Sequence, residues 1–314
     1  MPDNEQISLS IVTTIYKSSS FLTEFIDNSI KTLNEINEPN FEMIFVLDGI
    51  TDNSLSYLLE RKKNIPQIKI VELSRNFGHH YAASAGLKLS KGNLIFIIDC
   101  DLEVMPEILI QFKQELIDNP QFDVIYGYQS KRKGGFIEKK FGGLFWKLFN
   151  SLSDVKIPKN IITERLMTRR YLDSLLSLGD KNLFMAGMMY WVGYQQKGIE
   201  VQKKKRAGKS SYGFYKRLNL FFEAITSFSE KPLKLIFYFG LIISLLSVFV
   251  SLLLIIHKIM YPDAVLMGYT SMVLLILFSL GIIILSIGMT GIYLARVFKQ
   301  VQDRPIYIIK SIIE

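Results

Sequence analysis

Short apolar runs alternate with amphipathic segments over the first part of the chain. Five runs rich in β-branched and aromatic residues are typical of strands: residues 7–15, 41–47, 68–73, 94–98 and 124–128. Three segments carry apolar side chains three or four positions apart, as amphipathic helices do: residues 21–33, 81–89 and 107–119. Because strands and helices alternate, we predict an α/β fold with right-handed crossovers and a mostly parallel sheet.

The pattern changes toward the end of the sequence. Residues 235–256 and 264–295 contain no charged side chain, and each stretch exceeds the roughly 20 residues that a helix needs to cross the hydrocarbon core of a bilayer. We therefore expect two transmembrane helices. Basic residues flank the two stretches, whereas the loop between them carries little charge. This distribution, together with a first segment that lacks a signal-peptide pattern, predicts that the first domain and both termini face the cytoplasm.

Two carboxylates follow directly after the strand predicted at residues 94–98. Asp99 and Asp101 are one residue apart. In a parallel sheet they lie at the same edge as Asp48 and Asn76, which follow other predicted strands. Open α/β sheets bind ligands at this edge, and two carboxylates supply the hard oxygen ligands that Mg²⁺ prefers. The pattern indicates a divalent cation that bridges the protein to a ligand's diphosphate, although turn aspartates also occur for structural reasons alone.

Composition narrows the choice of partners and metal sites. The formal net charge of +8 suits an anionic membrane surface or phosphate ligands, and no nucleic-acid-binding motif accompanies it. We interpret the basic run at residues 203–206 as a solvated face attracted to anionic lipid. The single cysteine, Cys100, excludes an intrachain disulfide and a cysteine zinc site, and without a base partner it is not expected to act as a nucleophile. His79 and His80 would diverge on a helix, so we predict no metal site there.

Two further segments have the pattern of helices that lie in a membrane interface. Residues 141–152 and 214–225 carry aromatic and aliphatic side chains at helical spacing, beside lysines and an arginine. The alternative is that these apolar faces pack on the sheet domain. Helices in the interface would bring a lipid phosphate level with the cation site.

Six short motifs occur in order along nearly the whole chain. They are VTTIY at residues 12–16, LDG at 47–49 with Asp52, LSRNFG at 73–78, DCDLE at 99–103 with PE at 106–107, YWVG at 190–193 and RAGKSSY at 206–212. In this order and spacing the chain resembles family 2 glycosyltransferases of the GT-A fold, specifically the membrane-anchored branch of dolichyl- and polyprenyl-phosphate sugar synthases. The resemblance implies a metal-dependent hexosyltransferase with a Rossmann-like catalytic domain.

The resemblance also divides the chain into regions. It implies a GT-A nucleotide-sugar-binding core at residues 1–135 and an acceptor-side region with the interface helices at residues 136–230. Two transmembrane helices at residues 231–298 and a cytoplasmic tail at residues 299–314 would follow.

Positions that match the family motifs carry the implied site residues. Nucleotide binding is implied for Thr14, Tyr16, Asp48, Asn76 and Asp99, of which Asp48 matches the residue that holds the base. Asp99 and Asp101 match the motif that binds the diphosphate and Mg²⁺ or Mn²⁺, with Asp101 as the expected direct ligand. The acceptor phosphate would be held by Arg165, Arg206, Lys209 and Ser210. The candidate catalytic residues are Asp101, Arg165 and Glu164.

Three positions depart from the family pattern. Leu47 and Val104 stand where relatives have aspartates, and Thr163 replaces an aspartate that is a candidate base or acceptor-site residue. Thr163 cannot act as a carboxylate, and Glu164 can replace it only if the backbone turns its side chain toward the site. A lipid phosphate is already a nucleophile at neutral pH, whereas a sugar hydroxyl needs a base. The departures are therefore compatible with a phosphate acceptor.

The sequence thus predicts an inverting glycosyltransferase of the cytoplasmic (inner) membrane. It would move a sugar from a nucleotide-diphosphate sugar to polyprenyl (undecaprenyl) phosphate, for cell-surface polysaccharide or glycan modification. Two alternatives stay open: transfer to the hydroxyl of a lipid-linked saccharide with Glu164 as base, and a catalytically inactive membrane-anchored scaffold subunit. Retention of Asp99 and Asp101 argues against the scaffold. The paired apolar helices also allow a homo-oligomer, and no motif names the sugar.

Overall fold

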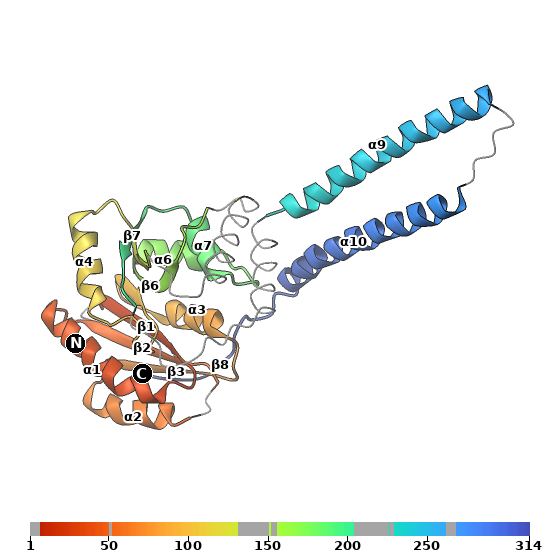
Figure 1. Cartoon of the computed structure of the whole chain (residues 1–314). Helices are drawn as coiled ribbons and strands as arrows, with labels where there is room; N and C mark the ends of the chain where they lie inside the picture. The colour runs from red at the N-terminus through yellow and green to blue at the C-terminus, as the bar shows by residue number, and fades with distance from the viewer. Residues whose placement is uncertain are drawn as a thin grey trace.

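A mixed sheet forms the centre of the protein (Figure 1). The computed structural model describes residues 7–49, 52–130, 151, 156–203, 226, 229–261 and 268–314. Within these residues the strands are β1 (Leu9–Ile15), β2 (Phe41–Leu47), β3 (Ile68–Leu73), β4 (Leu94–Ile97), β5 (Val124–Tyr128), β6 (Ile161–Thr168), β7 (Gln196–Glu200) and β8 (Ile309–Ile313). Their order across the sheet is β7-β5-β6-β4-β1-β2-β3-β8.

Strands β1 to β4 form the parallel part of the sheet. β1 pairs with β2 and β4, and β2 pairs with β3, all in parallel register. Their carboxyl ends therefore lie at one edge, as predicted. The strands predicted at residues 41–47, 68–73 and 124–128 are confirmed with the same bounds, and those at 7–15 and 94–98 are confirmed with shorter ones.

Helices cover both faces of the sheet. One face packs against α1 (Leu22–Glu35), α2 (Ser54–Asn64) and α4 (Ile108–Asp118), and a 3-10 turn at Ser19–Phe21 precedes α1. The other face packs against α3 (His79–Leu89), α6 (Arg169–Leu176) and α7 (Met185–Trp191). The three predicted helices correspond to α1, α3 and α4 and are confirmed, whereas α2, α6 and α7 were not predicted.

Close packing of α3 brings its start to the edge where the parallel strands end. A Cβ atom at Gly86 would lie 2.5 Å from Val12 Cγ1 and 2.8 Å from Val46 Cγ2. Any residue larger than glycine would therefore push α3 away from β1 and β2. The glycine lets the helix lie directly on these two strands.

The sheet is mixed, because β6 and β8 pair antiparallel with their neighbours, and neither these strands nor β7 were predicted from periodicity. β6 runs antiparallel between β4 and β5, and β7 extends the sheet beyond β5. At the other edge, β8 pairs antiparallel with β3. Its Lys310 and Ser311 contact the Glu72 carboxylate at 2.6 and 3.1 Å. Residues expected in a cytoplasmic tail therefore return to the α/β domain.

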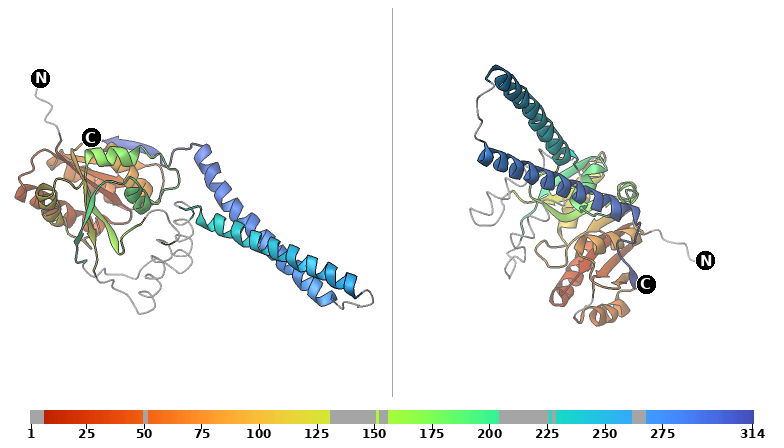
Figure 2. Two further views of the ribbon diagram at one scale, coloured as in Figure 1. Left: turned by 90° about the horizontal axis from the view of Figure 1, so that it is seen from above. Right: turned by 90° about the vertical axis from the view of Figure 1, so that its right-hand side faces the viewer.

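Two long helices, α9 (Lys231–Met260) and α10 (Tyr269–Val301), extend together away from the α/β domain (Figures 1 and 2). Within the described residues, one segment is long and apolar enough to cross a membrane: Phe278–Val301, with a mean hydropathy of 2.0 and no part of it buried. The predicted pair of transmembrane helices therefore stays a prediction. The predicted interface helices lie outside the described residues, except for residue 151.

Candidate active site

Predicted site residues gather where the parallel strands end. β1 aligns in parallel with β2 and β4, so the residues that follow these three strands share one edge. Tyr16 follows β1, Asp48 follows β2, and Asp99 and Asp101 follow β4. The Tyr16 side chain is 48% exposed at this edge. The geometry is that expected for a ligand bound across the strand ends.

Asp48 is buried and holds the loop that follows β3. Its Oδ1 accepts a hydrogen bond from the Phe77 N–H at 2.7 Å, and its Oδ2 accepts one from the Gly78 N–H at 2.9 Å. The side-chain amide of Asn76 donates to the Asp48 carbonyl at 3.2 Å. Gly78 has a φ of 106°, a conformation that glycine adopts at little cost. Asp48 thus fixes the turn into α3, and the nucleotide-binding roles of Asp48 and Asn76 stay predictions.

His79 contacts two predicted site residues, although no site role was predicted for it. Its Nδ1 lies 2.9 Å from Thr14 Oγ1, and its Nε2 lies 3.6 Å from Asp99 Oδ1. The imidazole therefore lies between the ends of β1 and β4. Its position directly after the glycine that ends the β3 loop was the available sequence signal.

The turn after β4 leaves both aspartates partly exposed and buries the cysteine between them. The Asp99 side chain is 29% exposed, and Asp101 Oδ1 accepts a hydrogen bond from the Glu103 N–H at 3.1 Å. Cys100 Sγ donates to the Thr14 carbonyl at 3.4 Å. Burial raises the pKa of the Cys100 thiol to about 12, so the thiol stays protonated and is a poor nucleophile.

The two aspartates fit a divalent cation. Mg²⁺ is usually bound in proteins by one or two carboxylates together with the phosphates of a substrate. Among the described residues, no group of three or more histidine, cysteine, aspartate and glutamate side chains has the geometry of a metal site. A cation held by Asp99 and Asp101 would take further ligands from the diphosphate and from water.

Glu164 lies on β6 next to Arg165, which pairs with Ile97 at the end of β4. The residue is 0% exposed, and neither carboxylate oxygen has a hydrogen-bond partner among the described residues. Burial raises the pKa of Glu164 to about 7, and the charges of Asp99 and Asp101 act in the same direction while Lys203 opposes them. The charges of Asp99 and Asp101 therefore act on Glu164, and its role as a base stays a prediction.

Lys203, three residues beyond β7, belongs to the same group of charges. Its Nζ lies 3.1 Å from Glu103 Oε2, and the two side chains are 21% and 18% exposed. Burial disfavours the ammonium charge, but Glu164, Glu103 and Asp99 together raise the pKa of Lys203. The interpretation of the run at residues 203–206 as a solvated face is wrong for Lys203, which is 21% exposed and pairs with Glu103 in the turn after β4, and residues 204–206 lie outside the described residues.

Arg165 lies beside Glu164 on β6 but contacts the backbone of its own strand. Its Nε donates to the Thr163 carbonyl and its Nη2 to the Ile162 carbonyl, both at 3.2 Å. The residue is 3% exposed. Its predicted role at the acceptor phosphate stays a prediction. The other predicted phosphate ligands, Arg206, Lys209 and Ser210, lie outside the described residues.

The chain is similar to several known glycosyltransferases. Glucosyl-3-phosphoglycerate synthase from Mycobacterium tuberculosis, solved with Mn²⁺, UDP-glucose and phosphoglyceric acid, aligns over 70% of this chain and 77% of its own, with a TM-score of 0.46 and 16% identity. An uncharacterized glycosyltransferase of Bacillus subtilis, YkcC, is 33% identical over 98% of this chain and 95% of its own. The bactoprenol glucosyl transferase of Shigella phage SfX is 31% identical over 97% of this chain and 99% of its own. The model of glycosyl transferase family 2 matches residues 10–176. The chain therefore belongs to glycosyl transferase family 2.

Proposed function

We propose that the protein transfers a sugar, with inversion, from a nucleotide-diphosphate sugar to polyprenyl phosphate at the cytoplasmic face of the membrane. Relatives named bactoprenol glucosyl transferase match it over nearly their whole length, which supports a polyprenyl-phosphate acceptor. The lipid-linked sugar would serve cell-surface polysaccharide or glycan modification. In this proposal α9 and α10 both span the membrane, and the basic residues beside them keep the α/β domain and both termini in the cytoplasm.

On the donor side, the chain's own residues position the diphosphate. Asp99 and Asp101 would hold Mg²⁺ or Mn²⁺, which when bound stabilises the negative charge of the departing diphosphate. Tyr16 is exposed at the same edge and is available to the base or ribose. Asp48 and Asn76 keep the loop before α3 in place through the hydrogen bonds described above.

The observation that carries the choice of acceptor is the burial of Glu164. A base must reach the proton that it removes, and a carboxylate that is 0% exposed does not reach an acceptor hydroxyl. The phosphate of a lipid acceptor attacks the anomeric carbon without losing a proton, so it needs only positioning cations. Because Arg165 is 3% exposed and donates through Nε and Nη2 to backbone carbonyls, we assign this task to Arg206, Lys209 and Ser210.

The experiment uses purified protein in detergent with Mg²⁺ or Mn²⁺, a panel of radiolabelled nucleotide sugars and undecaprenyl phosphate as the sole acceptor. Label in the extracted lipid that disappears with Asp101→Asn supports the proposal and identifies the donor. Asp118→Asn, an exposed aspartate that accepts a hydrogen bond from Gln114, is the matched control. If only a lipid-linked saccharide accepts sugar, the acceptor is a hydroxyl and the proposal is overturned. If neither acceptor is labelled by folded protein, the scaffold alternative replaces it.

A further inference from the structure

The unpaired Glu164 coincides with an irregularity in β6. Tyr126 on β5 lies opposite Arg165, but Tyr128, two residues further along β5, lies opposite Ile161. A single residue of β5, Gly127, therefore faces residues 162–164 of β6. The pairing of β6 with β4 also ends at Arg165. Residues 162–164 form a bulge between the two neighbouring strands, and bulges of this kind often redirect a side chain next to an active site.

Two features hold the bulge in place. Its carbonyls at Ile162 and Thr163 each accept a hydrogen bond from the Arg165 guanidinium, which is almost fully buried. The Ile162 side chain occupies the space above Gly127, where a Cβ atom would lie 2.5 Å from Ile162 Cδ1. The guanidinium thus binds carbonyls of residues that lie outside the paired register of β5 and β6. Gly127 has no side chain, so the Ile162 side chain can pack against its backbone.

The bulge ends at Glu164. This carboxylate is fully buried, has no hydrogen-bond partner among the described residues, and interacts electrostatically with Asp99, Asp101 and Lys203. A buried carboxylate without a hydrogen bond is costly to ionise. The Glu164 carboxylate interacts with the two aspartates that would hold a cation. An additional negative charge close to a cation site favours cation binding.

We infer that Arg165 is a positioning residue: it locks the β6 bulge and so places the Glu164 carboxylate behind Asp99 and Asp101, where Glu164 strengthens binding of a divalent cation together with a nucleoside diphosphate. The inference rests on the proposed function for the cation site. It departs from the predicted role of Arg165 as a ligand of the acceptor phosphate, because the residue is 3% exposed and two of its three guanidinium nitrogens donate to the bulge.

The test measures Mn²⁺ binding to the full-length protein in detergent at pH 8, by titration with UDP and in parallel with GDP. Arg165→Met and Glu164→Gln are each expected to weaken Mn²⁺ binding about fivefold, from the loss of one nearby negative charge. The double variant is expected to be no weaker than either single one, because Arg165 acts through Glu164. Gly127→Ala disturbs the bulge while Arg165 stays intact, and is expected to weaken Mn²⁺ binding as well.

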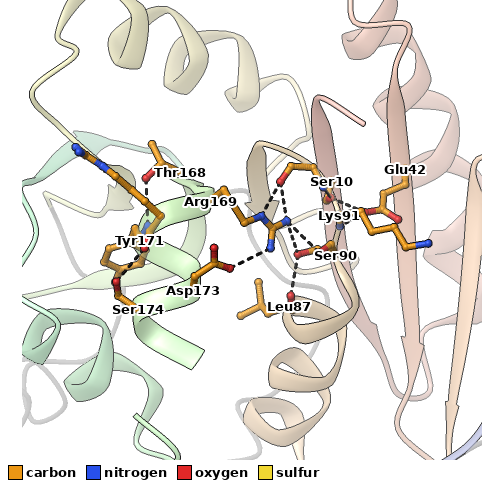
Figure 3. Close-up of polar contacts among 12 residues, drawn as sticks. Ser10, Glu42, Leu87, Ser90, Lys91, Thr168, Arg169, Tyr171, Asp173 and Ser174 are labelled. Atoms are coloured by element: carbon orange, nitrogen blue, oxygen red, sulfur yellow. Dashed lines mark hydrogen bonds and ion pairs between the residues drawn. The ribbon is translucent and has the colours of Figure 1, made fainter. Parts of the chain in front are cut away.

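A matched control is available in Arg169. Its guanidinium also donates to backbone carbonyls, at 3.0 Å to Gly92 through Nε and at 3.0 Å to Ser90 through Nη2, but near the start of β4 (Figure 3). Arg169→Met is expected to lower the melting temperature and to leave Mn²⁺ affinity within about twofold of the wild type. This separates a general loss of stability from a specific effect on the cation site.

The KM for undecaprenyl phosphate distinguishes the two roles of Arg165. If Arg165 acts only through Glu164, this KM changes less than about twofold in Arg165→Met. Loss of a charged contact to the acceptor phosphate would raise the KM about tenfold or more. A raised KM with unchanged Mn²⁺ affinity overturns the inference and leaves the proposed function standing. If the wild type binds no Mn²⁺ with either nucleotide and labels no lipid, the proposed function fails and the inference fails with it.

Discussion

Asp48 and Glu164 are both buried carboxylates near the same edge of the sheet, but the protein holds them in opposite ways. Asp48 follows a regular parallel strand, and both of its oxygens accept backbone hydrogen bonds. Glu164 lies in the irregular part of β6, and neither of its oxygens accepts a hydrogen bond from another described residue. Backbone N–H groups therefore stabilise the charge of Asp48, whereas burial and the charges of Asp99, Asp101 and Lys203 act on Glu164. Asp48 therefore stabilises a loop, whereas the Glu164 carboxylate can act on a bound ligand.

The strongest effect on sugar transfer should come from changes in the turn after β4, which contains Asp99 and Asp101. Asp101→Asn removes the charge expected to bind the cation directly, and we expect it to lower sugar transfer about a thousandfold, since such electrostatic stabilisation is usually a large part of catalysis. The measurement is the initial rate of lipid labelling with saturating donor. A reduction below tenfold in folded protein would move the chemistry away from this turn.

The next effect concerns the pH dependence of stability. Burial and Asp99 raise the pKa of Glu164 to about 7 in the folded protein, from 4.5 as its ordinary value. The folded state therefore keeps a proton that the unfolded chain releases above its own pKa. The contribution of Glu164 to stability is fully present below the unfolded pKa and is lost as the pH rises through the folded pKa, by about 3 kcal/mol.

Glu164→Gln isolates this contribution, because glutamine is uncharged at every pH and similar in shape. Apparent melting temperatures of the wild type and the variant are measured at pH 5 and pH 8. The wild type should lose more stability between the two values than the variant does. Equal losses would show that Glu164 titrates like an exposed carboxyl, and the contrast with Asp48 would then disappear.

Asp48→Asn addresses the other side of the comparison. Asparagine keeps one acceptor oxygen but turns an amide N–H₂ toward either Phe77 N–H or Gly78 N–H. We expect a loss of about 2 kcal/mol in the free energy of unfolding, the usual size for one lost hydrogen bond to a charged group. Denaturant titration followed by tryptophan fluorescence measures it. Because the effect is on the loop before α3, Mn²⁺ affinity should change less than in Glu164→Gln.

Sequence periodicity was sufficient for the regular half of the molecule. The alternation of apolar strands and amphipathic helices gave β1 to β5, and the parallel connections placed Asp48, Asp99 and Asp101 at one edge. Both results depend on local patterns, and such patterns are visible along a single sequence.

Periodicity was not sufficient for β6, β7 and β8. β6 contains Glu164 and Arg165 in its middle, so its pattern resembles neither a buried strand nor an alternating one. The contacts of His79 and Lys203 depend on which strands become neighbours, and Glu164 is directed by a bulge that only the pairing partner reveals. These are long-range properties that no local pattern encodes.

The smallest predicted effect is a difference in stability between variants of two lysines on or near β7. Lys203 pairs with Glu103 beside the carboxylates, and Lys197 pairs with Glu115 on α4, where the lysine is 39% exposed. Lys197→Met should cost well under 1 kcal/mol, as exposed ion pairs usually do. Lys203→Met should cost about 1 kcal/mol more, because it leaves Glu103 and Glu164 without the cation between them. Melting temperatures of the two variants measure the difference, and equal values would mean that the charges around Glu164 are as well screened by solvent as those on the surface of α4.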